Sequence, residues 1–224
     1  QALLRSGLTI SQMNKVRRRL SRIKGGGLAR AAAPARIVTL AISDVPGDDP
    51  AAIASGPTWP DPSVNEDLSD LADRLGNALP EKAADLLRSP PAAAPDFDAD
   101  YRLIAAPQMS LAAAAEVARA AGVTPVLLGD ALECEARELG IVMAGIAKAV
   151  ARHGTPNPAP VALLSGGETT VTLDIGACGR GGRNTEFLLS LLIALEGAPG
   201  IHALAVDTDG IDGTVEQVGF RSTR

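Results

Sequence analysis

Three apolar runs, each leading into a cluster of polar or small residues, constrain the fold of the C-terminal third of this chain. The runs span residues 161–164, 170–175 and 201–206, and the clusters span residues 165–169, 179–184 and 207–213. Short apolar runs bounded by turn residues are typical of buried strands. Open α/β sheets bind their ligands at the carboxyl ends of such strands. The pattern therefore predicts strands whose ends carry a ligand site.

The second cluster favours an anion. Gly181 and Gly182 stand directly before a helical pattern of apolar residues that includes Phe187 and Leu191. Glycine lets backbone N–H groups approach an anion closely, and a helix N-terminus adds a favourable field. Arg183, at the start of that helix, can donate two parallel hydrogen bonds to a phosphate or a carboxylate.

The third cluster favours a divalent cation. Asp207, Asp209 and Asp212 supply hard oxygen ligands that suit Mg²⁺ bridged to substrate phosphates. The alternative is that the glycines form tight turns and the aspartates are solvated or cap backbone groups. One cluster alone leaves both interpretations open. Three clusters that each follow an apolar run favour a shared site.

The first half of the chain repeats the pattern of a strand followed by polar residues. A strand over residues 36–43 ends at Ser43 and Asp44, where the alternative role for Asp44 is to cap a short helix. A helix is expected over residues 10–23, with Ser11 as its N-cap and residues 17–19 as a solvated arginine face. Lys24 opens a glycine-rich turn that either caps this helix or approaches a phosphate.

The middle of the chain predicts alternating strands and helices. Residues 64–87 have the periodicity of two helices, and residues 133–153 that of one long helix. Residues 101–106, 108–121 and 123–128 read as strand, helix and strand, which implies parallel strands joined by a right-handed crossover. The fold class expected from these elements is α/β.

Composition excludes several classes of protein. The net charge of −5 and the pI near 5.1 argue against nucleic acid as a partner, because binding to phosphate backbones needs a basic surface. Two cysteines and two histidines offer neither a disulfide scaffold nor a zinc site. No apolar segment approaches the roughly 18 residues of a membrane span. These features predict a cytoplasmic protein without a membrane partner.

Six segments together resemble the glycerate 2-kinases of the MOFRL family. They are NKVRRRLSRIKGG, TLAISDVPGDD, IASGPTWPDP, SGGETTVTL, GRGGRNTEF and AVDTDGIDG, in that order along the chain. The resemblance implies an incomplete Rossmann-like three-layer domain and a second, smaller α/β domain. Residues 1–95 would be the C-terminal part of the large glycerate-kinase domain, and residues 96–224 the MOFRL-type region. It also implies ATP-dependent phosphorylation of D-glycerate at its 2-hydroxyl, with Mg²⁺, to give 2-phosphoglycerate.

The resemblance assigns roles to particular residues. Asp44 would receive or orient the hydroxyl proton, and Arg183 would steady the transferring group or hold the glycerate carboxylate. Asp207, Asp209 and Asp212 would bind Mg²⁺. The remaining candidates would bind substrate or nucleotide: Lys24, Ser43, Ser55, Gly56, Ser165, Gly166, Gly167, Glu168, Thr169, Gly181, Gly182, Asn184 and Glu186.

Other outcomes remain open at this point. The chain begins without methionine and lacks the family's glycine-rich loop and catalytic lysine, so we expect a fragment that is inactive alone. A homodimer is one open option for the complete protein. One alternative is a hydroxypyruvate reductase using NAD(P)H, a label often given to this family, although no strand–GxGxxG–helix pattern is present. The other is a non-catalytic module that binds a sugar acid or a nucleotide.

Overall fold

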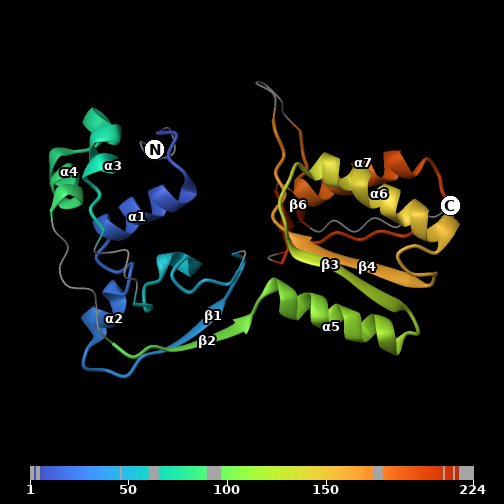
Figure 1. Ribbon diagram of the computed structural model, residues 1–224, viewed down its shortest axis with the longest axis horizontal. Helices are drawn as coiled ribbons and strands as arrows, with labels where there is room; N and C mark the ends of the chain where they lie inside the picture. The colour runs from blue at the N-terminus through green and yellow to red at the C-terminus, as the bar shows by residue number, and fades with distance from the viewer. Residues whose placement is uncertain are drawn as a thin grey trace. The chain divides into compact units, whose positions relative to one another are not determined.

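The computed structural model describes residue 3 and residues 6–45, 47–60, 66–89, 97–173, 179–208, 210–213 and 215–216 (Figure 1). Its contacts divide the chain into two compact units, Gln1–Ala106 and Pro107–Arg224. The domain boundary that the family resemblance places between residues 95 and 96 stays a prediction. No helix in the described ranges combines the length and the apolar character that crossing a membrane requires.

The first helix of unit 1, α1 (Ile10–Leu20), begins after Thr9 and not after Ser11 as expected. The Thr9 hydroxyl accepts a hydrogen bond from the Gln12 N–H at 3.3 Å, and the Gln12 side chain accepts one from the Thr9 N–H at 3.1 Å. This reciprocal pair is a capping box, which satisfies two backbone donors that the helix leaves free.

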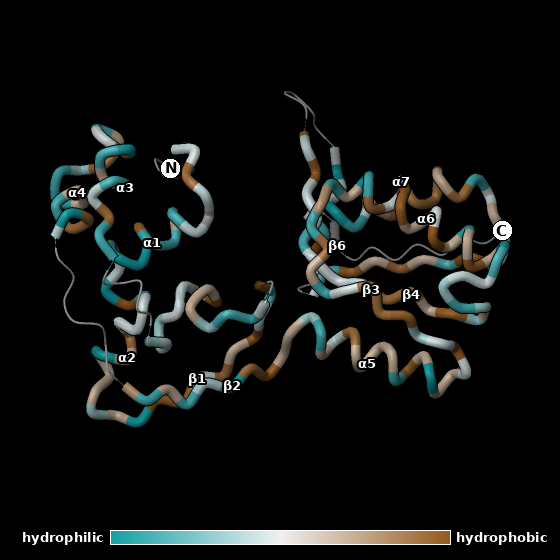
Figure 2. Tube along the Cα trace, viewed as in Figure 1, coloured by the Kyte–Doolittle hydropathy of each residue, from teal (hydrophilic) through white to brown (hydrophobic). Residues whose placement is uncertain are grey.

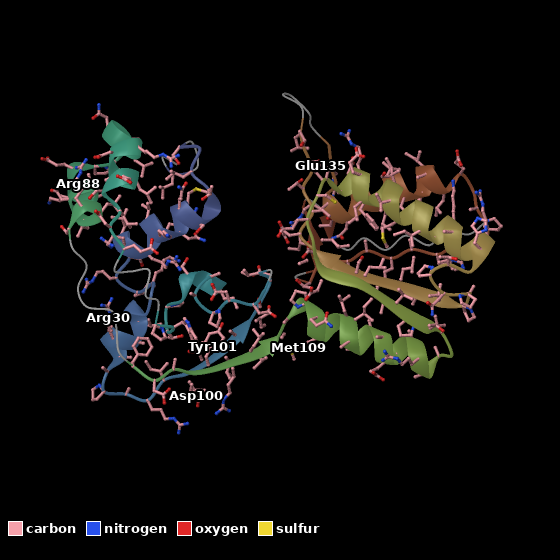
Figure 3. The ribbon with its side chains drawn as sticks, viewed as in Figure 1. Arg30, Arg88, Asp100, Tyr101, Met109 and Glu135 are labelled. Atoms are coloured by element: carbon pink, nitrogen blue, oxygen red, sulfur yellow. The ribbon has the colours of Figure 1, made fainter. Side chains whose placement is uncertain are left out.

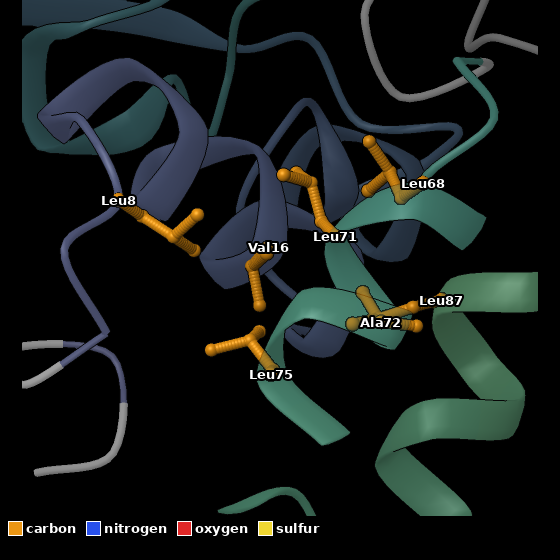
Figure 4. Packing of buried hydrophobic residues seen from close by; sticks show 7 residues of the cluster. All are labelled: Leu8, Val16, Leu68, Leu71, Ala72, Leu75 and Leu87. Atoms are coloured by element: carbon orange, nitrogen blue, oxygen red, sulfur yellow. The ribbon is translucent and has the colours of Figure 1, made fainter.

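Three helices enclose the core of unit 1. The two helices expected within residues 64–87 are present as α3 (Ser69–Leu75) and α4 (Glu81–Arg88), joined through the 3₁₀ turn η4 (Gly76–Ala78). Their apolar faces meet α1, as Figure 4 shows. The buried members of this core are Leu8, Val16, Leu68, Leu71, Ala72, Leu75 and Leu87.

The sequence suggested that the arginine run on α1 is a solvated face, but two of its members donate hydrogen bonds to other segments. The Arg19 guanidinium donates to the backbone carbonyls of Leu87 at 3.4 Å and Ser89 at 3.0 Å, at the end of α4. Arg18 donates to the carbonyl of Ala51 at 3.2 Å. The last carbonyls of a helix have no partner within it, so a cation there satisfies them and opposes their negative partial charge.

A parallel pair of strands lies beside the helices. Strand β1 (Val38–Ile42) pairs with β2 (Asp100–Ala105), in register from Val38 opposite Asp100. One side of β1 stays open, since Leu40 and Ile42 are 62% and 67% exposed. The same strand appears as an apolar stretch in Figure 2. Parallel strands are usually covered on both faces, so this surface suits a covering element.

Unit 2 contains a parallel βαβ arrangement. Strand β3 (Thr124–Leu132) leads through α6 (Ala136–His153) to β4 (Val161–Gly167), which pairs with β3 in parallel. The strands expected over residues 101–106 and 123–128 belong to different sheets of the described chain, because β2 pairs with β1 and β3 pairs with β4. Helix α5 (Pro107–Ala120) packs against β3 and β4.

Helices cover both faces of the β3–β4 pair. Figure 1 shows α5 on one face and the packed helices α6 and α7 (Arg183–Leu195) on the other. The core of this layer centres on Met143, Ala144, Leu191 and Leu195. Gly140 marks where α6 crosses α7, since a Cβ atom there would lie 2.6 Å from the Phe187 carbonyl oxygen.

The α/β class is therefore confirmed, whereas the Rossmann-like arrangement stays a prediction. A short antiparallel pair, β5 (Ile211–Asp212) and β6 (Val215–Glu216), completes the strands of the described residues. Two expected strands differ. Thr170 forms only an isolated bridge, and residues 171–173 are outside any strand. Residues 201–206 alternate between half-buried and exposed side chains, yet they belong to no sheet of the described chain.

Candidate functional site

The polar segments of unit 2 meet at Arg183, the first residue of α7. Its guanidinium donates to the Glu168 carboxylate and, at 3.4 Å, to the Thr169 carbonyl. Its other terminal nitrogen lies 3.8 Å from a carboxylate oxygen of Asp207. The hydrogen bond to Glu168, and then the charges of Glu168, Asp207 and Asp212, raise the pKa of Arg183. Arg183 therefore joins the first and third polar clusters.

A pocket of about 210 Å³ lies beside this junction. Ser165, Gly166, Gly167 and Thr169, at the end of β4 and just beyond it, contribute polar and backbone groups to its wall, together with Asn184 of α7. The rest of the lining is largely apolar: Leu132, Leu139, Phe187, Leu204, Ala205 and Val206. An apolar pocket with a few convergent polar groups is the usual form of a small-molecule site.

A close approach of two strand ends shapes the wall of this pocket. Gly167 has a φ of 152°, and a Cβ atom at this position would collide with the backbone of Leu132. The N–H of Glu168 donates to the Leu132 carbonyl at 3.1 Å. The glycine therefore lets β4 end tightly against β3, which directs Glu168 and Thr169 toward Arg183.

The N-terminus of α7 binds an anion, but the anion is part of the chain. The Asp212 carboxylate accepts the N–H groups of Asn184 at 2.9 Å and Thr185 at 2.8 Å, and the Thr185 hydroxyl at 2.6 Å. A Cβ atom on Gly182 would overlap this carboxylate. Asp212 thus takes up the N–H groups of Asn184 and Thr185, and the binding of an anion at Gly181 and Gly182 stays a prediction.

The expected Mg²⁺ site lies only partly within the described residues, and it stays a prediction. Asp212 is only 2% exposed, and both of its carboxylate oxygens accept hydrogen bonds from α7. Asp207 faces Arg183, and Asp209 lies outside the described residues. Within the described ranges, no three His, Cys, Asp or Glu side chains group closely enough to hold a metal ion. Asp207 remains a candidate, and Asp212 acts as a helix cap.

In unit 1 the expected Lys24 turn meets the loop that contains Ser55. The Lys24 ammonium donates to the Ala54 carbonyl at 3.2 Å. The Gly25 N–H donates to the Ser55 carbonyl at 3.0 Å. The Gly26 N–H donates to the Gly56 carbonyl at 2.7 Å. The structure therefore brings Lys24, Ser55 and Gly56 together. The N–H groups of Gly25 and Gly26 are both engaged in this contact, and the approach of Lys24 to a phosphate stays a prediction.

The loop that faces this turn is strained. Residues 54, 55 and 56 all have left-handed backbone, with φ of 51°, 64° and 59°, although Ala54 and Ser55 carry side chains. Such residues cost on the order of 1–3 kcal/mol each and gather at functional sites. The three hydrogen bonds from residues 24–26 help to hold the loop, which continues from the 3₁₀ turn η2 (Ile53–Ser55) and packs near α2 (Gly27–Ala32).

Ser43 and Asp44 lie at the carboxyl end of β1, as expected. Ser43 is buried, and its N–H donates to the Ala105 carbonyl at 2.9 Å, which extends the β1–β2 pairing. Asp44 is exposed. Asp44 does not cap the next short helix, because η2 has no side-chain cap; in the turn before it, the Asp49 carboxylate accepts the Ala51 N–H at 2.9 Å.

Two side-chain contacts that the sequence did not predict anchor the loop to the strands. The Thr58 hydroxyl lies 2.6 Å from that of Thr39 on β1. Trp59 meets Tyr101 of β2 edge to face, with ring centroids 5.4 Å apart. Burial, together with the nearby Asp49 and Asp48 charges, raises the pKa of Tyr101. The signal that the sequence offered for these contacts was the presence of β-branched and aromatic residues in the predicted strands.

Unit 2 also holds a carboxylate that the sequence did not single out. Glu135, at the N-cap position of α6, accepts hydrogen bonds from Thr170 and Thr172, directly after the polar cluster of residues 165–169. The sequence offered only an acidic residue before a long helix as a signal.

Glu186, the remaining sequence candidate of unit 2, lies on the first turn of α7, where its N–H donates to the Gly182 carbonyl at 3.0 Å. Unit 2 therefore brings together Ser165, Gly166, Gly167, Thr169 and Asn184 at the pocket, with Glu168, Arg183 and Asp207 beside it. Asp44, Ser43, Lys24, Ser55 and Gly56 lie in unit 1. The shared cleft expected for Asp44, Arg183 and Asp207 stays a prediction.

The fold and the pocket define an α/β protein that presents polar groups where parallel strands end. Residues 161–223 match the MOFRL family, and residues 1–88 match the family described as Domain of unknown function (DUF4147). The MOFRL match lies within the C-terminal unit and confirms the resemblance drawn from the six segments.

Curated relatives carry two kinds of name. A protein of Agrobacterium vitis with a provisional hydroxypyruvate reductase name is 57% identical over 223 residues, which cover 98% of this chain and 50% of that protein. The D-glycerate 2-kinase of Thermotoga maritima is 40% identical over 220 residues, which cover 97% of this chain and 52% of that protein. The chain thus spans about half the length of these relatives.

A solved structure confirms the fold. The crystal structure of glycerate kinase from Thermotoga maritima superposes with a TM-score of 0.88 at 39% identity, over 97% of this chain and 52% of that chain. At this level of identity the shared fold and the shared motifs indicate common ancestry. The pocket is therefore interpreted by comparison with the kinase.

Proposed function

We propose that this chain is part of an enzyme that transfers the γ-phosphoryl group of ATP to the 2-hydroxyl of D-glycerate, giving 2-phosphoglycerate. One observation carries the proposal: the first and third polar clusters of unit 2 converge on Arg183 beside a pocket. The names of the kinase relatives support it.

Arg183 suits phosphoryl transfer because that reaction needs positioning and neutralisation of spreading negative charge more than covalent chemistry. A guanidinium has five N–H donors in a fixed plane. Glu168, the Thr169 carbonyl and Asp207 engage part of this plane and hold its orientation. A phosphate or carboxylate entering the pocket would meet a cation whose geometry is set in advance, which lowers the cost of ordering it.

Asp44 is our candidate for the group that orients or accepts the proton of the attacking hydroxyl. Its carboxylate is exposed at the end of β1, and the short helix η2 that follows has no side-chain cap. A general base must come within hydrogen-bond reach of the proton that it takes. The strained loop at Ser55 and Gly56, together with Lys24, is the neighbouring surface proposed to bind substrate.

The finer assignments remain predictions. Mg²⁺ would accompany ATP, and Asp207 is the described carboxylate that best suits it, because Asp212 serves α7. A cytoplasmic location and a homodimer stay expectations from the sequence and the resemblance.

The reductase name on the Agrobacterium vitis relative motivates the second candidate function. Dinucleotide cofactors place their pyrophosphate on a helix N-terminus that follows a strand and a glycine-rich turn. In unit 2 the glycine-rich turn leads into α7, and its first N–H groups are bound by Asp212. This occupancy favours the kinase.

Two assays test the choice. A chimera would join this chain to the half of the Agrobacterium vitis relative that it does not match. We expect ADP release that depends on D-glycerate, ATP and Mg²⁺, and no oxidation of NADH or NADPH with hydroxypyruvate. Oxidation of either nucleotide without ADP release would overturn the kinase proposal. The 224-residue chain alone serves as the control for the dependence on the added half.

A further inference from the structure

We propose that Glu135 is a positioning residue of the unit 2 pocket, whose carboxylate fixes the segment that presents Glu168 and Thr169 to Arg183. Glu135 has no expected role in the sequence analysis, and it lies 33 residues before Glu168 in the chain. The inference rests on the proposed function for its catalytic consequence, whereas its structural part stands on the contacts alone.

The carboxylate of Glu135 gathers three donors from one short segment. Its Oε1 accepts the hydroxyls of Thr170 at 2.7 Å and Thr172 at 2.9 Å, and its Oε2 accepts the Thr172 N–H at 3.1 Å. Hydrogen bonds to an ionised carboxylate are stronger than those between neutral groups. The Thr170 hydroxyl first, and then Thr172, lower the pKa of Glu135.

Two backbone hydrogen bonds join the same two segments. The Thr170 N–H donates to the Cys134 carbonyl at 2.9 Å, and the Ala136 N–H donates to the Thr170 carbonyl at 2.9 Å. Glu135 stands at the N-cap position of α6, where Figure 3 labels it, and the helix field favours a carboxylate there. Residues 168–172 are therefore tied to the start of a long helix.

The segment that Glu135 holds lies within two residues of the pocket. Glu168 pairs with Arg183, and the Thr169 carbonyl accepts a hydrogen bond from it, directly before the anchored Thr170. Thr169 also lines the pocket. Residues 171–173, the described part of the segment after Thr170, form no regular strand, so the Glu135 carboxylate supplies the geometry that a ladder of strand hydrogen bonds would otherwise give.

Hydrogen exchange of the 224-residue chain tests the structural part. In Glu135→Gln we expect the Thr172 amide to exchange at least about tenfold faster, because it loses a charged acceptor. Glu138→Gln is the matched control, since Glu138 lies on the first turn of the same helix and its carboxylate pairs with the adjacent Arg137. Equal exchange at Thr172 in the two variants would overturn the proposal.

Kinetics of the chimera test the positioning role. We expect Glu135→Gln and Thr172→Val each to lower kcat about tenfold, and the double variant to be no slower than the worse single variant. Thr172→Ser keeps the hydroxyl donor and should retain most of kcat. Additive losses, or equal losses in the serine and valine variants, would overturn the positioning role. If every chimera lacks kinase activity, the proposed function fails, while the exchange result still decides whether Glu135 holds the segment.

Discussion

The Asp212 carboxylate lies directly against Gly182, so that a methyl group on residue 182 would overlap it. Gly182 has an extended backbone, with a φ of −163°, which any residue can adopt. The requirement for glycine at this position is therefore one of space. Because residue 182 has no side chain, the Asp212 carboxylate can reach the start of α7. This contact joins the second polar cluster to the third.

Gly182→Ala should destabilise unit 2, because the added methyl must displace Asp212 or the turn. Overpacking of this kind costs about 1–3 kcal/mol, and loss of the helix cap adds to it. Urea unfolding followed by circular dichroism measures the change. Gly179→Ala is the matched control, since a Cβ atom there meets nothing within 4 Å. Equal stability of the two variants would contradict the packing of Gly182 against Asp212.

Asp212→Asn should make the free energy of unfolding depend less on pH in the acidic range. Burial alone would raise the pKa of Asp212, but hydrogen bonds from Thr185 and Asn184 outweigh burial and lower it. A group whose pKa falls on folding contributes stability above its unfolded pKa, and that contribution is lost as the pH falls through the lower pKa of the folded state. Denaturation at stepped pH should give a shallower decline for the asparagine variant. Parallel curves would exclude a charged cap.

Much of the fold could be predicted from local pattern. Periodicity located α3, α4, α5, α6 and α7, as well as β1 to β4, within a few residues, since each of these elements buries one side of its own chain. Helix α1 ends three residues before the predicted point, because Ser21 leaves the helical region with a ψ of 136°. The strand expected over residues 201–206 has the right alternation, but no described strand pairs with it.

The site could be predicted only in part. The clusters that follow strands were visible in the sequence, and the pocket lies among them. The partner of each polar residue was not visible, because Asp212 lies 28 residues from Asn184 and Glu135 lies 37 from Thr172. Whether an aspartate binds a metal or caps a helix depends on which backbone donors face it, and spacing along the chain does not reveal that.

Arg19→Ala should destabilise unit 1. Its guanidinium donates to carbonyls at the end of α4, including those of Leu87 and Ser89, and a charged hydrogen bond contributes about 1.5–3 kcal/mol when well formed. Partial exposure reduces this figure, so we expect a loss of about 1–2 kcal/mol in chemical unfolding. Arg17→Ala is the control, because Arg17 donates to Asn14 on its own helix. Equal effects would show that the arginine run is only solvated.

Arg183→Ala in the chimera should lower kcat on the order of 10³-fold with little change in KM, as expected for a cation that stabilises transferring phosphoryl charge. Arg183→Lys should recover only part of this loss, because an ammonium keeps the charge but lacks the planar donors. Initial rates at varied D-glycerate and ATP separate the two constants. A rise in KM for glycerate at unchanged kcat would instead show that Arg183 holds the glycerate carboxylate.

The most direct test of the proposed function is the identity of the phosphorylated product. Phosphorus NMR of the chimera with D-glycerate, ATP and Mg²⁺ should show the γ-phosphate signal replaced by 2-phosphoglycerate in step with ADP, while Arg183→Ala leaves ATP almost intact over the same time. A phosphate on the 3-hydroxyl, or no phosphoglycerate from a folded chimera, would contradict the account.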